Sequence, residues 1–205
     1  MRERRPCGRD VRTPLVRILI TGPIVKRLVL AFLLIALPLL ARERAVLIYP
    51  REHALFPFFY TSHQRELLRG LRARYEVDVH EQIASADDLF AIDVRGASLL
   101  VISGHGDPFS ISLSGRDERT LDSAQRERLT AFLGTLAPDA TIVLQSCDTG
   151  RGFAWLVKEA AGPSRHVIAA KGTIPRDGVR FSLAPFDAAI TCRDDGRDWD
   201  CTLRL

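Results

Sequence analysis

Short apolar runs alternate with amphipathic segments along most of the chain. The apolar runs contain few polar interruptions, as buried strands do, while the segments between them repeat their apolar positions at helical spacing. The pattern predicts strands over 45–49, 75–80, 98–103, 141–145 and 166–170, and helices over 62–75, 85–90, 122–136 and 152–161. Ser85 and Asp122 or Ser123 are candidate caps for two of these helices.

The alternation of strand and helix predicts an α/β fold. It favours a three-layer arrangement, in which one mostly parallel sheet carries helices on both faces. The tail, 186–205, contains the turn sequence Asp194-Asp195-Gly196 between two strand-like runs and predicts a C-terminal β-hairpin. Sites in such sheets lie beyond the carboxyl ends of the parallel strands, so residues that directly follow a predicted strand are the first candidates for chemistry.

Charge separates the chain into a basic leader and a slightly acidic remainder. Residues 1–44 hold ten Lys or Arg and three Asp or Glu, whereas residues 45–205 hold nineteen and twenty-two. The basic character therefore belongs to the leader, and the charge of the remainder does not indicate a nucleic-acid-binding protein. We expect two parts, a leader over 1–44 and one folded domain over 45–205.

The leader has the pattern of an export signal. Lys26-Arg27 precedes the thirteen-residue apolar run Leu28–Leu40, which is shorter than the roughly 20 residues of a membrane-spanning helix. This predicts an exported protein, periplasmic or secreted, or one tethered to a membrane through residues 28–40. A cytoplasmic protein with a buried apolar segment is the alternative.

The four cysteines have different surroundings. Cys7 lies in the leader. Cys192 and Cys201 flank the predicted hairpin turn, where they either face each other and form a disulfide, as in an oxidising compartment, or remain two separate thiols. Cys147 has no evident partner, and a remaining thiol needs a separate explanation.

His105 and Cys147 each directly follow a buried strand. The run Ser98–Ser103 leads into Gly104-His105-Gly106, and the run Thr141–Gln145 leads into Ser146-Cys147. Consecutive parallel strands bring these two loops to the same edge of the sheet. An imidazole beside a thiol can help to form the thiolate nucleophile and can later protonate the leaving amine. The sequence therefore predicts a cysteine–histidine site.

The neighbouring residues suit the same chemistry. Gly106 permits a close approach of substrate, and its N–H, with that of Cys147, is a candidate donor to an oxyanion. The predicted helix that starts near Gly152 would add its positive dipole end close to the thiol. Among the other histidines, His166 opens a predicted strand and is expected to be structural. His53 falls in a predicted loop, His63 at a helix start and His80 at a strand end.

Two segments resemble motifs of the caspase-like (clan CD) cysteine peptidases. They are LLVISGHGD and TIVLQSCDTGRG, with the histidine 42 residues before the cysteine. A caspase signature of the form Gln-Ala-Cys-x-Gly, with its histidine about 50 residues upstream, is similar. The nearest branch is the bacterial CHAT peptidases, which share a Cys-acidic-Thr-Gly pattern and a strand like HVIAAKGTIP, and the legumain-type peptidases are a second relative. The resemblance covers residues 98–176.

The resemblance implies a caspase-like domain and a thiol protease, a hydrolase without cofactor or metal that acts on protein or peptide substrates. His105 becomes the general base and acid, Cys147 the nucleophile, and Gly106 with Cys147 the oxyanion hole. Asp148 is a candidate substrate-binding residue that would select Arg or Lys, although as a residue before a helix it could instead cap that helix. Arg176 and Arg180 are alternatives that would select acidic residues. The oligomeric state is left open.

Three other functions compete with a peptidase. A caspase-like module that binds partners without cleaving them is the main alternative. A cysteine phosphatase needs an arginine six residues after the cysteine, and position 153 is Phe. A redox protein needs a resolving cysteine near Cys147, and none is close in sequence.

Overall fold

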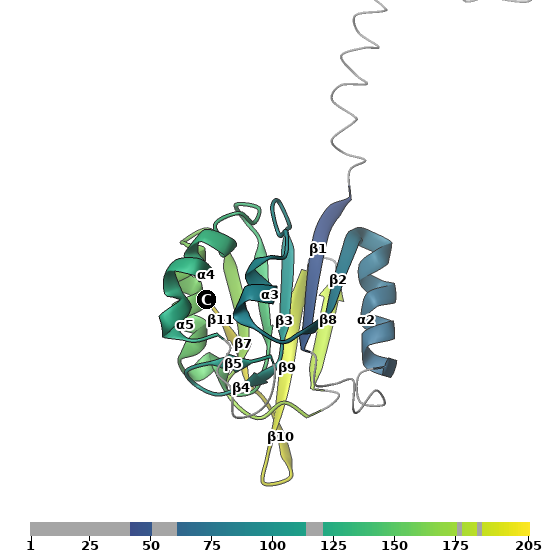
Figure 1. Ribbon diagram of the computed structural model, residues 1–205. Helices are drawn as coiled ribbons and strands as arrows, with labels where there is room; N and C mark the ends of the chain where they lie inside the picture. Colours follow the sequence, from purple (N-terminus) through teal and green to yellow (C-terminus); the bar gives the residue numbers. More distant parts are fainter. Residues whose placement is uncertain (1–41, 51–60, 114–120, 176–177, 184–185) are drawn as a thin grey trace, which may run out of the picture. The chain divides into compact units, whose positions relative to one another are not determined.

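The computed structural model describes residues 42–50, 61–113, 121–175, 178–183 and 186–205 (Figure 1). All of these ranges belong to one compact unit that spans residues 42–205. The predicted leader segment 1–41, with its apolar run Leu28–Leu40, lies outside the described residues. None of the helices within the described ranges is long and apolar enough to cross a membrane.

A six-stranded sheet forms the centre of the domain. Its strand order is β11-β7-β6-β3-β1-β2, and every neighbouring pair is parallel except β11 with β7. The strands are β1 (Glu43–Pro50), β2 (Tyr75–Ile83), β3 (Leu99–Ser103), β6 (Thr141–Gln145), β7 (His166–Ala170) and β11 (Thr202–Arg204). The α/β prediction is confirmed, and β6 and β7 have the bounds that the apolar runs predicted.

Different elements cover the two faces of this sheet (Figure 1). Leu100, Ile142 and Val167 pack on one face in a core shared with α3 (Ala86–Phe90), α4 (Arg126–Leu133) and α5 (Phe153–Ala161). Val101 and Val143 pack on the other face with α2 (Thr61–Arg74) and a small antiparallel sheet. Because both faces are covered, the central strands are apolar on both sides, which explains their continuous apolar runs.

Two predicted caps mark the starts of helical segments. The Ser85 Oγ accepts the Asp88 N–H at 3.1 Å, and the Asp88 carboxylate accepts the Ser85 N–H at 3.0 Å, which completes a capping box at α3. The Asp122 carboxylate accepts the Ala124 N–H at 2.8 Å at the start of the short helix η3 (Ser123–Gln125), which leads into α4.

The tail is more than the predicted hairpin. The hairpin consists of β9 (Phe186–Asp194) and β10 (Arg197–Asp200), and β8 (Val179–Leu183), which the sequence did not predict, pairs with β9 to complete a three-stranded sheet. The chain then leaves the hairpin as β11 and joins the central sheet. Cys192 and Cys201 form a disulfide, with their Cα atoms 5.6 Å apart, so the alternative of two separate thiols is wrong.

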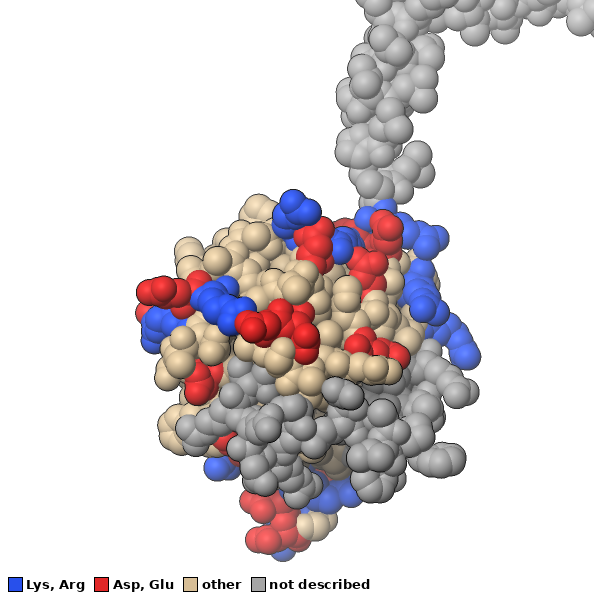
Figure 2. All heavy atoms as spheres, viewed as in Figure 1, with Lys and Arg blue, Asp and Glu red and all other residues tan. Residues whose placement is uncertain are grey.

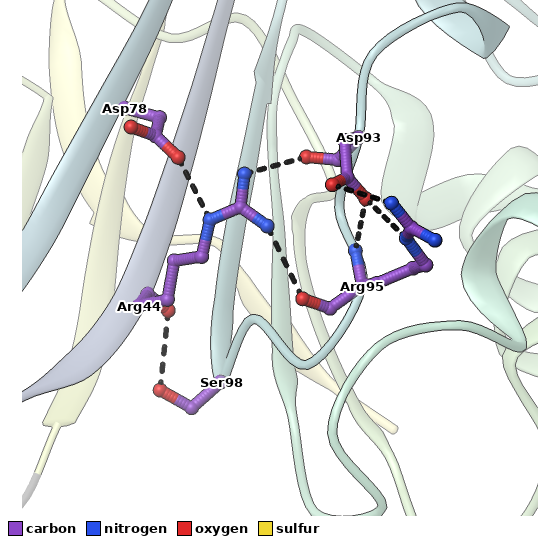
Figure 3. A network of polar contacts seen from close by, with 5 residues as sticks. All are labelled: Arg44, Asp78, Asp93, Arg95 and Ser98. Atoms are coloured by element: carbon purple, nitrogen blue, oxygen red, sulfur yellow. Dashed lines mark hydrogen bonds and ion pairs between the residues drawn. The ribbon is translucent and has the colours of Figure 1, made fainter. Parts of the chain in front are cut away.

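Arg44 binds the strands together at their amino ends (Figure 3). Its guanidinium donates to the Asp78 carboxylate at 2.7 Å and to the main-chain oxygens of Asp93 at 2.8 Å and Arg95 at 3.1 Å. Its own carbonyl accepts the Ser98 N–H at 2.9 Å. These contacts join β1, β2 and the turn before β3 at the edge opposite to the candidate site.

Charges on the helical face balance locally. Arg126 of α4 pairs with Glu159 of α5, and Arg128 of α4 pairs with Asp87 of α3, each at 2.7 Å. Figure 2 shows these signs interspersed over the described residues of this face. Exposed pairs of this kind contribute little to stability, but they leave α3–α5 without a continuous basic surface.

Candidate active site

The carboxyl ends of β3 and β6 are held in register. Ser103 lies opposite Gln145 in the parallel ladder, and the Ser103 hydroxyl donates to the Gln145 side-chain oxygen at 3.0 Å. His105 lies two residues beyond Ser103, and Cys147 lies two residues beyond Gln145. The two predicted residues therefore leave the same edge of the sheet from equivalent positions on neighbouring strands.

A small hairpin carries His105. The strand β4 (His105–Gly106) pairs antiparallel with β5 (Ile111–Ser112), an element that the sequence did not predict. The Asp107 carboxylate accepts the Phe109 N–H at 2.6 Å and the Ser110 hydroxyl at 2.9 Å, which closes the turn between the two strands. Asp107 therefore shapes the loop on which the histidine lies.

Gly106 lies against the loop that carries the cysteine. A Cβ at this position would meet the Cys147 carbonyl oxygen, and it would lie 2.8 Å from the Ser146 Cβ and 2.9 Å from the Thr149 Cγ2. Only a glycine permits two backbones to approach this closely. The contact brings the His105 loop directly against the Cys147 loop.

The ladder determines how the Gly106 amide is oriented. The Asp107 N–H donates to the Ser110 carbonyl at 3.1 Å, so Asp107 and Ser110 form a hydrogen-bonded pair of the β4–β5 hairpin. Hydrogen-bonded pairs alternate with non-bonded pairs in an antiparallel ladder, and Gly106 opposite Ile111 is the next pair. The Gly106 N–H is therefore directed away from β5, as an oxyanion donor would need to be.

The cysteine loop makes a sharp turn at Asp148. This residue has a left-handed backbone, with φ of 57°, and its N–H donates to the Gly172 carbonyl at 3.0 Å. Asp is one of the residues that adopt this conformation at low cost. The chain continues into the short helix η4 (Thr149–Arg151), and the Thr149 hydroxyl donates back to the Ser146 carbonyl at 3.1 Å.

The Asp148 carboxylate faces Arg151. The Arg151 Nε lies 3.1 Å from an Asp148 oxygen and also donates to the Lys171 carbonyl at 2.8 Å. Asp148 occupies the cap position of η4, but its side chain makes no capping hydrogen bond, so the expectation that it caps the helix is wrong. The carboxylate proposed for substrate binding already has a cationic partner in this structure.

The Cys147 thiol is half-buried and forms no disulfide. Its Sγ accepts a hydrogen bond from the Ile174 N–H, with a donor–acceptor distance of 3.3 Å. A donated N–H favours the thiolate over the neutral thiol. The sequence pointed instead to the amino end of α5, whose first N–H, that of Phe153, donates to the Pro108 carbonyl at 2.7 Å. Ile174 has no local sequence signal, because it reaches Cys147 from the loop after β7.

The Ser146 side chain is buried beside Cys147. Its residue is 2 % exposed, and its Oγ has no partner within the described part of the chain. A buried hydroxyl without a hydrogen bond lowers the free energy of unfolding, and the methyl group of an alanine at this position would not have this cost.

The structure describes four of the six other candidates: His63, His80, His166 and Arg180. His80 lines a shallow cavity of about 680 Å³ between the end of β2 and α3, together with Gln82 and Asp88. His166 is exposed at the start of β7, and Arg180 is exposed on β8. His63 lies in α2, and two further candidates, His53 and Arg176, lie outside the described residues.

Within the described ranges, no group of three or more His, Cys, Asp or Glu side chains is placed to hold a metal ion. Comparison with known proteins finds no family model that matches the chain and no curated protein that matches it.

Proposed function

We propose that the chain is a cysteine endopeptidase of the caspase-like kind, with Cys147 as the nucleophile and His105 as the general base and acid. One observation carries the proposal. The register of β3 and β6 sets His105 and Cys147 at equivalent positions on one sheet edge, and Gly106 lies in contact with the Cys147 loop. The resemblance of both loops to motifs of the caspase-like peptidases adds independent support.

The proposed reaction has two covalent steps. The Cys147 thiolate attacks the carbonyl carbon of the scissile peptide bond, and the proton held by His105 passes to the leaving amine as the carbon–nitrogen bond breaks. Water then attacks the resulting thioester, with His105 accepting its proton, and the carboxylic acid product leaves the thiol. The hydrogen bond from the Ile174 N–H supports this scheme because it favours the thiolate.

The oxyanion of the tetrahedral intermediate needs fixed donors. We assign this role to the N–H groups of Gly106 and Cys147. The orientation of the Gly106 N–H away from β5 supports the assignment. Main-chain donors are effective here because they need no reorganisation as the charge develops.

Selection of Arg or Lys through Asp148 stays a prediction. A cationic substrate side chain would have to compete with Arg151, whose Nε lies 3.1 Å from the Asp148 carboxylate. A positional-scanning peptide library compared between wild type and Asp148→Asn tests the idea. A preference for Arg or Lys that disappears in the variant supports it, whereas a preference for Asp or an apolar residue contradicts it.

Peptide hydrolysis with matched variants tests the function. We expect wild type to cleave a peptide mixture, Cys147→Ala to be inactive, and His105→Ala to be slower by about 10²–10⁴-fold. His166→Ala is the control, because this histidine is exposed at the start of β7 and far along the strand from the site edge. Retention of full activity by folded Cys147→Ala would refute the proposal, and a folded wild type that binds peptides without cleaving them would favour the binding module.

We also propose that the protein is exported, as a secreted or periplasmic protein or as one anchored in a membrane through residues 28–40. The Cys192–Cys201 disulfide supports an oxidising compartment. Mass spectrometry of cell fractions tests this. Recovery from an extracytoplasmic or membrane fraction with the disulfide intact is expected, and a full-length cytoplasmic protein with both thiols reduced contradicts it.

A further inference from the structure

The loop of residues 171–174, here called the bridging loop, connects the candidate nucleophile with the disulfide hairpin. It follows β7 at the carboxyl edge of the central sheet. On one side it contacts the Cys147 loop, and on the other it contacts β9, β10 and the residues around the Cys192–Cys201 disulfide. These two sets of contacts come from parts of the chain that are far apart in sequence.

Three hydrogen bonds join the bridging loop to the nucleophile loop. The Asp148 N–H donates to the Gly172 carbonyl at 3.0 Å, and the Arg151 Nε donates to the Lys171 carbonyl at 2.8 Å. The third is the bond from the Ile174 N–H to the Cys147 Sγ at 3.3 Å. The position of the loop therefore determines whether the Ile174 N–H reaches the Cys147 sulfur.

The hairpin holds the opposite side of the loop. The Lys171 N–H donates to the Cys201 carbonyl, and the Arg193 N–H donates to the Thr173 carbonyl, both at 3.0 Å. Gly172 packs so closely on the hairpin that an added Cβ would lie 2.9 Å from the Trp199 ring and 3.1 Å from the Cys192 sulfur.

The cysteines of the hairpin are fully buried, while Trp199 is 38 % exposed. The disulfide joins the end of β10 to β9, so it fixes the carbonyl of Cys201 and the amide of Arg193, both of which hold the loop. Without this crosslink the hairpin would rely on noncovalent contacts to keep those groups in place, among them the backbone pairing, the Trp199 contact and the ion pair between Arg193 and Asp198 at 2.7 Å. A covalent constraint at this point limits how far the bridging loop can move from the sulfur.

We propose that the Cys192–Cys201 disulfide, together with Trp199, positions the Cys147 thiol by holding the bridging loop against it. The proposal rests on the assignment of Cys147 as the nucleophile. The disulfide and Trp199 are positioning residues, because they touch the loop and not the reacting sulfur.

The test measures the alkylation rate of Cys147 by iodoacetamide in the full-length protein, quantified by mass spectrometry of the Cys147 peptide. We expect Cys192→Ser with Cys201→Ser to slow alkylation about threefold to tenfold, the range expected for the loss of one hydrogen bond. Gly172→Ala leaves the disulfide intact but pushes the loop from the hairpin, and we expect a similar slowing. Trp199→Ala removes the ring that packs on Gly172, and we expect it to slow alkylation as well.

Two comparisons make the result specific. Arg165→Met destabilises the domain away from the loop, so a slowing in this control equal to that in Gly172→Ala would overturn the proposal. Unchanged alkylation in both the disulfide variant and Gly172→Ala, beside a slowed His105→Ala, would also overturn it while leaving the proposed function intact. Slowing by the disulfide variant, Gly172→Ala and Trp199→Ala, with no effect of His105→Ala, would support the positioning and refute the dyad.

Discussion

Gly106→Ala should disturb the candidate site through a single methyl group. The new Cβ would lie 2.8 Å from the Ser146 Cβ and 2.9 Å from the Thr149 Cγ2, and it would also meet the Cys147 carbonyl oxygen. Backbone atoms on both sides must move, and overpacking of this kind costs about 1–3 kcal/mol. In a domain of this size each kcal/mol lowers the melting temperature by about 2–4 °C, so the expected decrease is about 2–12 °C.

The matched control for this change is Gly104→Ala. Its Cβ would also be too close to its neighbours, at 2.6 Å from the Ser112 carbonyl oxygen and 2.8 Å from the Ile111 Cγ2, but these belong to β5 and not to the Cys147 loop. We expect calorimetry to show comparable destabilisation by both variants, and iodoacetamide to alkylate Cys147 at a changed rate only in Gly106→Ala. Unchanged stability and unchanged thiol reactivity in Gly106→Ala would refute the reasoning that the two loops are in contact here.

Three further predictions concern stability. Arg165 donates to four carbonyl oxygens, so Arg165→Met should lower the free energy of unfolding, measured in urea, by about 2–3 kcal/mol. The control Arg197→Met, at an exposed position, should lower it by under about 0.5 kcal/mol, and equal losses in the two variants would contradict the prediction. Ser146→Ala should stabilise the domain by about 1 kcal/mol, because it removes a buried hydroxyl that has no partner among the described residues, and a clear loss of stability would show that the hydroxyl has a partner. Hydrogen bonds from Arg95 lower the pKa of Asp93 to about 2. The ionised carboxylate therefore stabilises the folded domain fully above about pH 4, and this contribution is lost as the pH falls towards 2. In Asp93→Asn the free energy of unfolding should depend less on pH within this window.

The parts of the fold that depend on local pattern were predictable from the sequence. The apolar runs 141–145 and 166–170 matched β6 and β7 because both faces of these central strands are buried. The side chain of Ser85 caps α3 because capping uses a polar group a few residues from its donor. The placement of His105 and Cys147 after neighbouring strands followed from the same pattern and from the rule that parallel strands align their carboxyl ends.

The features that the sequence did not predict depend on contacts between distant residues. The strands β4 and β5 have two residues each and carry too short a pattern to detect. The hydrogen bond from Ile174 to Cys147 spans 27 positions and depends on how the chain leaves β7. The alternative role of Asp148 as a helix cap is wrong, because its carboxylate makes no capping hydrogen bond and pairs with Arg151 instead.

Labelling with a thiol-reactive peptide probe tests the central claim most directly. The full-length protein is incubated with the probe near neutral pH, and the adduct on Cys147 is quantified by mass spectrometry in wild type, His105→Ala and the control His166→Ala. The proposed dyad predicts an adduct on Cys147 that forms at least about tenfold more slowly in His105→Ala, because the imidazole no longer assists the thiolate, and at the wild-type rate in His166→Ala. Equal labelling rates in wild type and folded His105→Ala would contradict the claim that His105 and Cys147 act together.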